Sequence, residues 1–461
     1  MARRYGRVGR RVRTLATAPV DELVTLFGAW LTLGGHLGSG RDRLFTPSRT
    51  FWLFLAQVFS ADGSCREVVR RFLGWLSLTD VPLASPNTGA YCRARARLPR
   101  EGICGIHRGL AQRIQTLSTS QDRWYGRDVK VVDGTSISMP DTPENQERYP
   151  QSSRQKPGCG FPIMNLVGVF SLATGVLIDL AKGHRKVSEQ ALFRQLWDLF
   201  APGEVALTDR KFCSFAEIHL MAQRDIDVVM RNHQCRIKGI ELVKRLGKTD
   251  RLIRWIKTKV CPKWLTQAQW EELPDTLLIR EITCHVDVPG FRTKTITVVT
   301  TLLDATQFPT QAFTDLYRRR WMVELFFDDI KTTMGMDILR CKTPDMVEKE
   351  LYMHLIAYNL VRALMLHAAR EHAVSPFRLS FKGTVDTVRT WSPLMAAAPS
   401  AARPQMYASL LKTIARDTLP IRPNRVEPRA RKRRPKNYQR LTENRHVFKE
   451  CPHRNKYRRE A

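Results

Sequence analysis

Closely spaced cysteine pairs are missing from this sequence. Ten Cys are scattered through 461 residues, and none forms the Cys-x-x-Cys pair found in many zinc and redox motifs. The one zinc-like pair, Cys451 and His453, has no second pair nearby. This usage argues against a disulfide framework and predicts a reduced, cytoplasmic protein.

A long uninterrupted apolar run is also missing. The nearest approach to a membrane-spanning stretch is residues 161–180, which Pro162 and Asp179 interrupt. Thr174 and Gly175 divide this stretch into two apolar runs, which is typical of a hairpin between buried strands. The basic start of the chain has no apolar segment directly behind it, unlike a signal peptide. We therefore expect no membrane partner.

Acidic residues are scarce relative to basic ones. The chain has 75 Lys and Arg against 44 Asp and Glu, a formal net charge of +31. Such an excess favours a polyanionic partner, because neutralising phosphates releases counterions. Residues 1–13 hold six Arg and no acid, and residues 421–461 hold 15 Lys and Arg against 4 Glu. We predict a nucleic-acid-binding protein of the cytoplasm and nucleoid, although either charged end could be a merely solvated tail.

The character of the sequence changes several times along the chain. Residues 20–120 show apolar positions at helical spacing, whereas strand-forming runs begin at Val129. From there three strands, a helix, a strand, a helix and a strand follow, which indicates an α/β fold with a mixed sheet. The predicted segments are a basic arm (1–19), a helical DNA-binding domain (20–120), a catalytic core in two pieces (125–232 and 304–372), a β-rich insertion (233–303), C-terminal helices (373–420) and a basic tail (421–461).

Two aspartates stand at the ends of predicted strands. Asp133 follows a β-rich run and precedes Gly134, and Asp209 ends a second short strand before Arg210. Aspartate in such a place is most often a turn or cap residue. Two of them on separate strands, in a strongly basic chain, also suit a site that works on phosphate.

A third acid lies in the run from Tyr317 to Lys331. Tyr317, Arg320, Glu324 and Lys331 are spaced by 3, 4 and 7 residues. On one continuous helix, predicted over about 310–334, these four fall within about 60° of one another. A single carboxylate between cations suits a metal ligand working on a phosphate, although Glu324 could simply pair with Arg320.

The remaining apolar positions of the run lie on another side of the predicted helix, which suits packing against a core. These are Val323, Phe326, Phe327 and Ile330. Asp328 is a rival to Glu324, and Asp141, in a Pro-flanked loop, is a rival to Asp133.

Three acids on separate elements can hold two Mg²⁺ ions if they converge. Mg²⁺ prefers oxygen ligands and keeps positions open for water and phosphate oxygens. Two such ions about 4 Å apart can assist both the attacking and the leaving oxygen of a phosphodiester. We therefore predict Asp133, Asp209 and Glu324 as catalytic, metal-binding residues.

The motif Tyr-x2-Arg-x3-Glu-x6-Lys resembles the signature of the DDE transposases of the insertion-sequence-four family. The match at Tyr317, Arg320, Glu324 and Lys331 shows no departure. The segments 131–135 and 207–210 resemble the two Asp motifs of that family, and the likeness extends from about residue 20 to 395. Residues 88–95 and 139–145 also resemble family segments.

This resemblance implies an RNase H-like core with a β-rich insertion, and the helical spacing over residues 20–120 predicts an all-α N-terminal domain. It implies cleavage of double-stranded DNA at transposon ends and joining of the 3′-hydroxyl to target DNA, with two Mg²⁺ that Mn²⁺ can replace. It also implies that Tyr317, Arg320 and Lys331 contact the terminal phosphates, and that a homodimer forms on DNA. Arg210, next to Asp209, is a further DNA-binding candidate.

Several alternatives stay open. A metal-dependent nuclease or resolvase would cut without joining, and a domesticated transposase would bind DNA without chemistry. Some family members flip a base onto an aromatic of the insertion, for which Trp255, Trp264 and Trp270 are candidates, each also a plausible core residue. His184 could lie near the metals or on DNA, although a plain loop histidine is the simpler interpretation.

Overall fold

The computed structural model describes residues 22–38, 44–77, 84–233, 239–285, 295–421, 441–444 and 447. The predicted basic arm lies outside these residues, as does most of the predicted basic tail. Within the described part of the chain, no helix is both long and apolar enough to cross a membrane.

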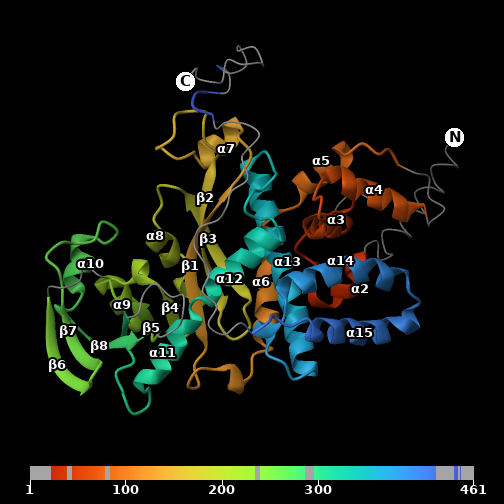
Figure 1. The fold of residues 1–461 in the computed structure, drawn as a ribbon. Helices are drawn as coiled ribbons and strands as arrows, with labels where there is room; N and C mark the ends of the chain where they lie inside the picture. Colours follow the sequence, from red (N-terminus) through yellow and green to blue (C-terminus); the bar gives the residue numbers. More distant parts are fainter. Residues whose placement is uncertain are drawn as a thin grey trace, which may run out of the picture.

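A nine-stranded mixed sheet runs through the molecule, and helices flank it (Figure 1). The strand order is β3-β2-β1-β4-β5-β9-β8-β7-β6. β1, β4 and β5 are parallel neighbours, whereas the other neighbours in the sheet pair antiparallel. The strands are β1 (Val129–Ser138), β2 (Ile163–Ser171), β3 (Leu177–His184), β4 (Val205–Thr208), β5 (Asp227–Arg231), β6 (Ile240–Gly247), β7 (Asp250–Ile256), β8 (Thr276–His285) and β9 (Thr295–Thr300). The predicted α/β class with a mixed sheet is confirmed.

The central strands are buried on both faces. Every residue of β4 is buried, and Val131 and Val132 of β1 are fully inaccessible. Because both faces of such strands are buried between helical layers, their sequences are nearly continuous apolar runs. The predicted hairpin is confirmed as β2 and β3, whose turn uses Gly175 with a φ of +71°. Glycine suits this position because it lacks the Cβ that disfavours positive φ.

The outer strand β3 contains a bulge next to Asp179. The pairing with β2 shifts there, so that Ile178 is an extra residue. Asp179 accepts a hydrogen bond from the backbone N–H of Leu180 at 2.8 Å, and the Nε of Arg108 donates to its other oxygen at 2.8 Å. The side chain of Asp179 therefore takes up the Leu180 N–H of this outermost strand.

Within the described residues, helices come before the first strand and after the last one (Figure 1). α13 is the central one, and residues on all its sides are buried between α6, α3, α14 and α15, as expected of a helix inside a core. The α-helices are α2 (Glu22–Phe27), α3 (Pro47–Phe59), α4 (Cys65–Leu76), α5 (Gly89–Arg97), α6 (Arg100–Gln115), α7 (Pro143–Arg148), α8 (Glu189–Arg194), α9 (Phe215–Ala222), α10 (Gln267–Glu272), α11 (Thr310–Arg319), α12 (Met322–Asp328), α13 (Pro344–Glu371), α14 (Phe381–Ala397) and α15 (Arg403–Arg416).

One hydrophobic core joins the N-terminal helices to the sheet. Leu26 of α2 and Ile103 of α6 belong to the same buried cluster as Val131 and Leu360. A smaller cluster lies between α3, α4 and α5. The boundaries of the predicted domains remain predictions.

The segment 233–303 supplies four strands and α10. The described part of this segment is thus rich in strands, as the sequence predicts. A buried ion pair joins this segment to the start of α11: Arg280 donates to both oxygens of Asp250 at 2.9 and 2.5 Å, and the Thr310 hydroxyl donates to Asp250 at 2.7 Å. The burial of both charges requires such complete pairing.

The predicted continuous helix over 310–334 is wrong in one respect. Backbone bonds of the i→i−3 kind tighten the chain between α11 and α12, from Arg320 to Glu324. A π-helical turn, η5 (Asp329–Thr333), follows α12. Sequence periodicity assumes uniform winding, whereas 3₁₀ and π turns rotate later side chains relative to earlier ones.

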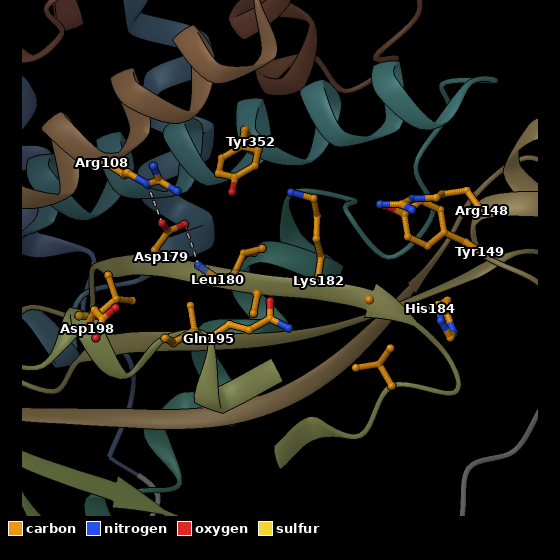
Figure 2. A pocket seen from close by; sticks show the side chains of 15 residues that line it. Arg108, Arg148, Tyr149, Asp179, Leu180, Lys182, His184, Gln195, Asp198 and Tyr352 are labelled. Atoms are coloured by element: carbon orange, nitrogen blue, oxygen red, sulfur yellow. Dashed lines mark hydrogen bonds and ion pairs between the residues drawn. The ribbon is translucent and has the colours of Figure 1, made fainter. Parts of the chain in front are cut away.

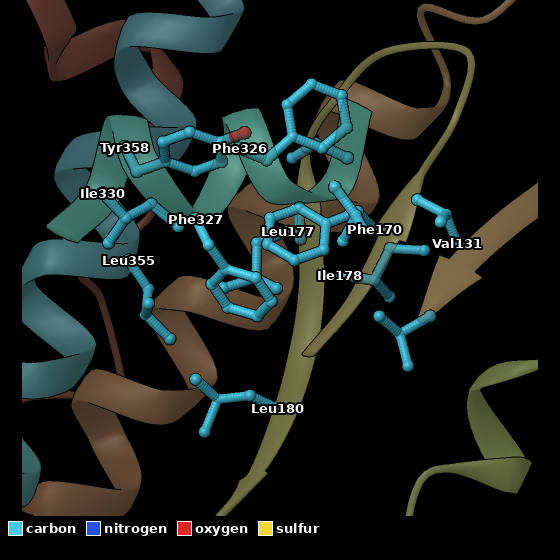
Figure 3. Close-up of a cluster of buried hydrophobic side chains, with 14 of the residues drawn as sticks. Val131, Phe170, Leu177, Ile178, Leu180, Phe326, Phe327, Ile330, Leu355 and Tyr358 are labelled. Atoms are coloured by element: carbon cyan, nitrogen blue, oxygen red, sulfur yellow. The ribbon is translucent and has the colours of Figure 1, made fainter. Parts of the chain in front are cut away.

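α12 packs against the sheet through aromatic side chains (Figure 3). Phe326 and Phe327 contact the ring of Phe170 of β2, with centroids 5.5 and 5.1 Å away. Val323 and Ile330 are fully buried as well. The predicted apolar side of this segment is confirmed.

Candidate active site

Asp133 and Asp209 lie on neighbouring parallel strands. Val131 of β1 is paired with Leu207 of β4. Continuing this register by two residues places Asp133 level with Asp209, which directly follows β4. Neighbouring strands are about 4.8 Å apart, so the two backbones come close at the carboxyl ends of the strands.

The carboxylate of Asp133 is largely enclosed. Its Oδ1 accepts a hydrogen bond from the backbone N–H of Gly134 at 2.8 Å. Burial raises the pKa of Asp133 to about 6, although the Gly134 bond and the charge of Arg320 act in the opposite direction. The charges of Asp209 and Glu324 raise this pKa further, so the three predicted acids interact electrostatically.

The carboxylate of Asp209 caps a 3₁₀ turn, η4 (Arg210–Phe212). Its Oδ1 accepts a hydrogen bond from the backbone N–H of Lys211 at 2.8 Å. The Lys211 ammonium in turn contacts both oxygens of Glu189 at 3.0 and 3.1 Å. This hydrogen bond with Glu189 raises the pKa of Lys211, and the charges of Glu189, Asp209 and Asp133 add to the effect.

Arg320 connects the helical side of the site to the strand side. One guanidinium nitrogen lies 3.4 Å from Oδ2 of Asp133, and another lies 3.0 Å from Oε1 of Glu324. The side chain of Glu324 is 40% exposed, compared with 19% for Asp133. Glu324 therefore has room to rotate, whereas Asp133 does not.

Lys331 reaches β1 from the π turn. Its ammonium donates to the Thr135 hydroxyl at 3.0 Å, two residues from Asp133. The uneven winding therefore does not carry Lys331 away from the predicted site. It brings Arg320, Glu324 and Lys331 to the same stretch of β1.

The other two predicted DNA-binding residues differ in exposure. Arg210 is exposed at the start of η4. Tyr317 is only 7% exposed and lies beneath Arg320, whose guanidinium is 5.8 Å from its ring centre. Burial raises the pKa of Tyr317 to about 12. The structure thus brings Tyr317, Arg320, Glu324 and Lys331 into one region with the two aspartates.

The donor types at this site suit a hard divalent cation. Three carboxylates come from separate elements, and Asp133 and Glu324 share one arginine. In the part of the chain that the structure describes, no three His, Cys, Asp or Glu side chains are grouped as a metal cluster. Arg320 lies between Asp133 and Glu324, so joint ligation requires Glu324 to turn away from Arg320. The residue types fit a cation, and joint ligation also requires Arg320 to leave Asp133, from which it lies 3.4 Å away.

Residues 124–360, slightly more than half of the chain, match the protein family described as the transposase DDE domain. The chain belongs to the DDE transposases. It is 29% identical over 408 residues to the transposase InsG for insertion sequence element IS4 of Escherichia coli K12. The aligned region covers 86% of this chain and 88% of that protein. The resemblance to the insertion-sequence-four family is confirmed.

Two weaker similarities accompany this match. The putative transposase InsZ of the same strain is 26% identical over 188 residues, which is 40% of this chain and 60% of that protein. Among solved structures, the piggyBac transposase synaptic complex with hairpin DNA aligns with a TM-score of 0.42 and 9% identity, over 87% of this chain and 86% of that one.

The rival acids of this transposase have other contacts. Asp328 is exposed and accepts a hydrogen bond from the Thr332 hydroxyl at 2.6 Å. Asp141, also exposed, accepts one from the side chain of Gln146 at 2.7 Å. Neither contact involves Asp133, Asp209 or Glu324.

Burial separates the three tryptophan candidates. Trp255 is fully buried and Trp270 is 4% exposed, so both are core residues. Trp264 is only partly buried, and the guanidinium of Arg194 lies 4.2 Å from its ring centre. Of the three, only Trp264 could receive a base without unfolding of the insertion.

A groove of about 570 Å³ runs along the edge of β3 (Figure 2). Its cations include Arg108, which pairs with Asp179, and Lys182, which pairs with Glu348 at 3.4 Å. His184 lies at one end, where its Nδ1 accepts a hydrogen bond from the backbone N–H of Lys186 at 3.2 Å. Acids therefore compensate two of the cations that line this groove.

Two polar residues at this site were not predicted from the sequence. Glu189 lies against Gly134 and binds Lys211, and Thr135 binds Lys331. Ser188 is recognisable as an N-cap, which is the ordinary reason for an acid in the first turn of a helix. Only the tertiary contact gives Glu189 a place beside the aspartates.

Proposed function

We propose that this transposase binds the ends of its insertion sequence, hydrolyses the DNA there and joins the resulting 3′-hydroxyl to target DNA. The proposal depends chiefly on one observation: Arg320 contacts both Asp133 and Glu324, and Asp209 directly follows β4, the parallel neighbour of the strand that carries Asp133. The order β3-β2-β1-β4-β5, with the last three strands parallel, supports an RNase H-like core.

Asp133, Asp209 and Glu324 would hold two Mg²⁺, with Mn²⁺ as a substitute. Bound there, the cations would supply Lewis-acid assistance to the attacking and leaving oxygens of a phosphodiester. The parallel pairing of β1 with β4 ends two residues before Asp133 and Asp209, which brings both aspartates to the same edge of the sheet. Ionised carboxylates are needed, which requires loss of the Asp133 proton.

Arg320, Lys331 and Arg210 would bind DNA phosphates beside these acids. Arg320 presents a planar fork that matches a phosphate, and Lys331 acts as a point charge. Tyr317 would support Arg320 from below. Its burial and raised pKa keep its hydroxyl protonated and enclosed, so no covalent tyrosyl intermediate forms.

Two DNA ends require two such sites, so we propose a homodimer on double-stranded DNA. The net charge of +31 supports a DNA partner through phosphate neutralisation. The place of action would be the cytoplasm, at the DNA of the nucleoid.

The test uses the purified chain and a duplex that carries the DNA flanking its gene. We expect nicking at the element's ends, joining to a second duplex, and loss of both activities in EDTA. Glu324→Gln should abolish cleavage and keep end binding.

Three other outcomes would contradict the proposal. Cutting without joining would indicate a nuclease or resolvase. End binding without Mg²⁺-dependent nicking would indicate a domesticated DNA-binding protein. Cleavage retained in Glu324→Gln would remove Glu324 from the active site.

A further inference from the structure

The first residues of α8 lie against Gly134, which follows Asp133, and against η4, which follows Asp209. Ser188 caps the helix by accepting a hydrogen bond from the N–H of Ala191 at 3.2 Å. The next two residues, Glu189 and Gln190, both contact Lys211, which follows β4. A helix 20 residues earlier in the chain thus reaches the loop that carries Asp209.

Lys211 is fixed at three points. Its backbone N–H donates to Asp209 at 2.8 Å, its carbonyl accepts from the side-chain nitrogen of Gln190 at 2.6 Å, and its ammonium contacts both oxygens of Glu189. The position of the Lys211 amide, which orients the Asp209 carboxylate, therefore depends on α8.

Glu189 also lies against Gly134, the residue that follows Asp133. A Cβ placed on Gly134 would lie 2.5 Å from Cδ and 2.7 Å from Oε2 of Glu189. The Gly134 N–H donates to Asp133. The Glu189 carboxylate thus packs against the peptide that orients Asp133, in space that only glycine leaves open.

Apolar packing supports these polar contacts. Phe193 of α8 and Phe212, next to Lys211, are both fully buried, with ring centres 5.2 Å apart at an angle of 72°. Leu192 is fully buried as well. The first turn of α8 is therefore held at a fixed distance from η4.

We propose that the Glu189–Lys211 pair is a positioning clamp that sets the carboxylates of Asp133 and Asp209 for a divalent cation. The clamp consists of Glu189, Gln190 and Lys211, and none of the three is itself a ligand. The proposal depends on the proposed function, because it needs the cation site. A partner that orients a ligand in this way typically changes metal affinity by about 10–100-fold.

The clamp should affect ligation more than folding. The side chain of Lys211 is 61% exposed and that of Glu189 is 27% exposed, and ion pairs of this kind contribute little to stability. A surface ion pair without a role would therefore leave both folding and cation affinity nearly unchanged on mutation, and a structural role would lower the thermal midpoint, whereas a positioning role changes cation affinity alone.

The experiment measures Mn²⁺ binding to the full chain by isothermal titration, alongside the thermal midpoint and DNA-end binding in EDTA. Glu189→Ala should raise the Mn²⁺ dissociation constant about tenfold. Its thermal midpoint and end binding should stay unchanged, and Glu189→Asp should recover part of the affinity. Lys382→Ala, which removes an exposed ion pair with Asp386 on α14, serves as the matched control.

Gly134→Ala tests the same contact from the other side. Its methyl group would displace Glu189, so Mn²⁺ affinity should fall in the wild-type background. In the Glu189→Ala background the same substitution should have a much smaller effect, because the obstructing carboxylate is gone.

Several results would overturn the clamp. Unchanged Mn²⁺ affinity in Glu189→Ala, or additive effects of the two substitutions, would do so. A loss as large as that of Asp209→Asn would make Glu189 a ligand instead. Weaker end binding with unchanged Mn²⁺ affinity would assign Lys211 to DNA. A wild-type chain that binds no Mn²⁺ would overturn the proposed function as well, which separates the two failures.

Discussion

Asp133 on β1 and Asp209 directly after β4 lie beside two paired parallel strands, whereas Glu324 lies on a helical segment that changes its winding on both sides. The strand side is enclosed and its carboxylates accept backbone hydrogen bonds. The helix side is more exposed, and its carboxylate contacts the side chain of Arg320. The difference indicates a preformed half and an adjustable half of one active site.

Arg320 belongs to both halves and has competing partners. It contacts Asp133 and Glu324, and in the proposed complex it also binds a DNA phosphate. Contact with phosphate would draw the guanidinium away from the acids and leave them available to a cation. Binding of DNA and completion of the cation site would then be linked.

The largest expected effect is on the strand side. Asp209→Asn keeps the shape of the side chain and its place before η4, but removes a charged ligand. We expect cleavage to fall by roughly a thousandfold, because Lewis-acid assistance contributes several kcal/mol to the transition state. End binding should persist in a gel-shift assay. Cleavage within tenfold of wild type would show that the strand side is not the fixed half.

Arg320→Ala should separate the two partners of Arg320. End binding should weaken by roughly 30-fold, as expected for the loss of a charge-assisted hydrogen bond. Mn²⁺ binding without DNA should stay the same or become tighter, because a competing cation beside Asp133 and Glu324 is gone. Weaker Mn²⁺ binding would show that Arg320 supports the ligands, and unchanged end binding would remove its role on DNA.

The pKa of Asp133, about 6, predicts a pH dependence. A cation needs the ionised carboxylate, so the Mn²⁺ dissociation constant should rise about tenfold for each pH unit below that value. For folding the sign is opposite: the raised pKa gives stability that is present below the ordinary pKa of Asp and lost as pH rises through about 6. Asp133→Asn should abolish this step in urea denaturation, whereas a step of unchanged size would assign it to another group.

The smallest expected effect is a change in stability at the contact between β2 and α12, which joins the two halves. A Cβ on Gly168, which is paired with Asp133, would lie 3.1–3.2 Å from Leu177, Phe170 and Phe327. Gly168→Ala should lower the free energy of unfolding by about 1 kcal/mol, because crowding in a packed core exceeds the entropic gain.

The control for that substitution is Gly109→Ala on the exposed side of α6, where no atom lies within 4 Å of the new methyl group. It should stabilise the chain by about 1 kcal/mol, because alanine is the better helix former. Equal effects at the two positions would show that α12 does not press on β2.

The strand side was the more predictable half from sequence. Short apolar runs ending in Asp133 and Asp209 define both the strands and their exits, and parallel strands must present those exits at one edge. The hairpin of β2 and β3 was equally accessible, because Thr174 and Gly175 mark its turn.

The helix side and the clamp were less predictable for physical reasons. The signature spacing named residues that lie in one region, but a uniform helix does not bring them together. Phe326 and Phe327 pack on Phe170 of β2, and Lys331 reaches Thr135 of β1, so their positions depend on the sheet. Glu189 and Lys211 are 22 residues apart, and nothing local connects them. Burial of Trp255 and Trp270 likewise depends on the strands around them.

The bulge beside Asp179 has a consequence for how copies of this chain can meet. An outermost strand normally offers its backbone to any passing strand, and such contacts grow into open-ended aggregates. Here a carboxylate already occupies the Leu180 amide and an arginine covers that carboxylate. This part of the β3 edge is therefore a poor place for a second copy of the chain to add a strand, whereas the mostly exposed β6 forms the opposite edge of the same sheet.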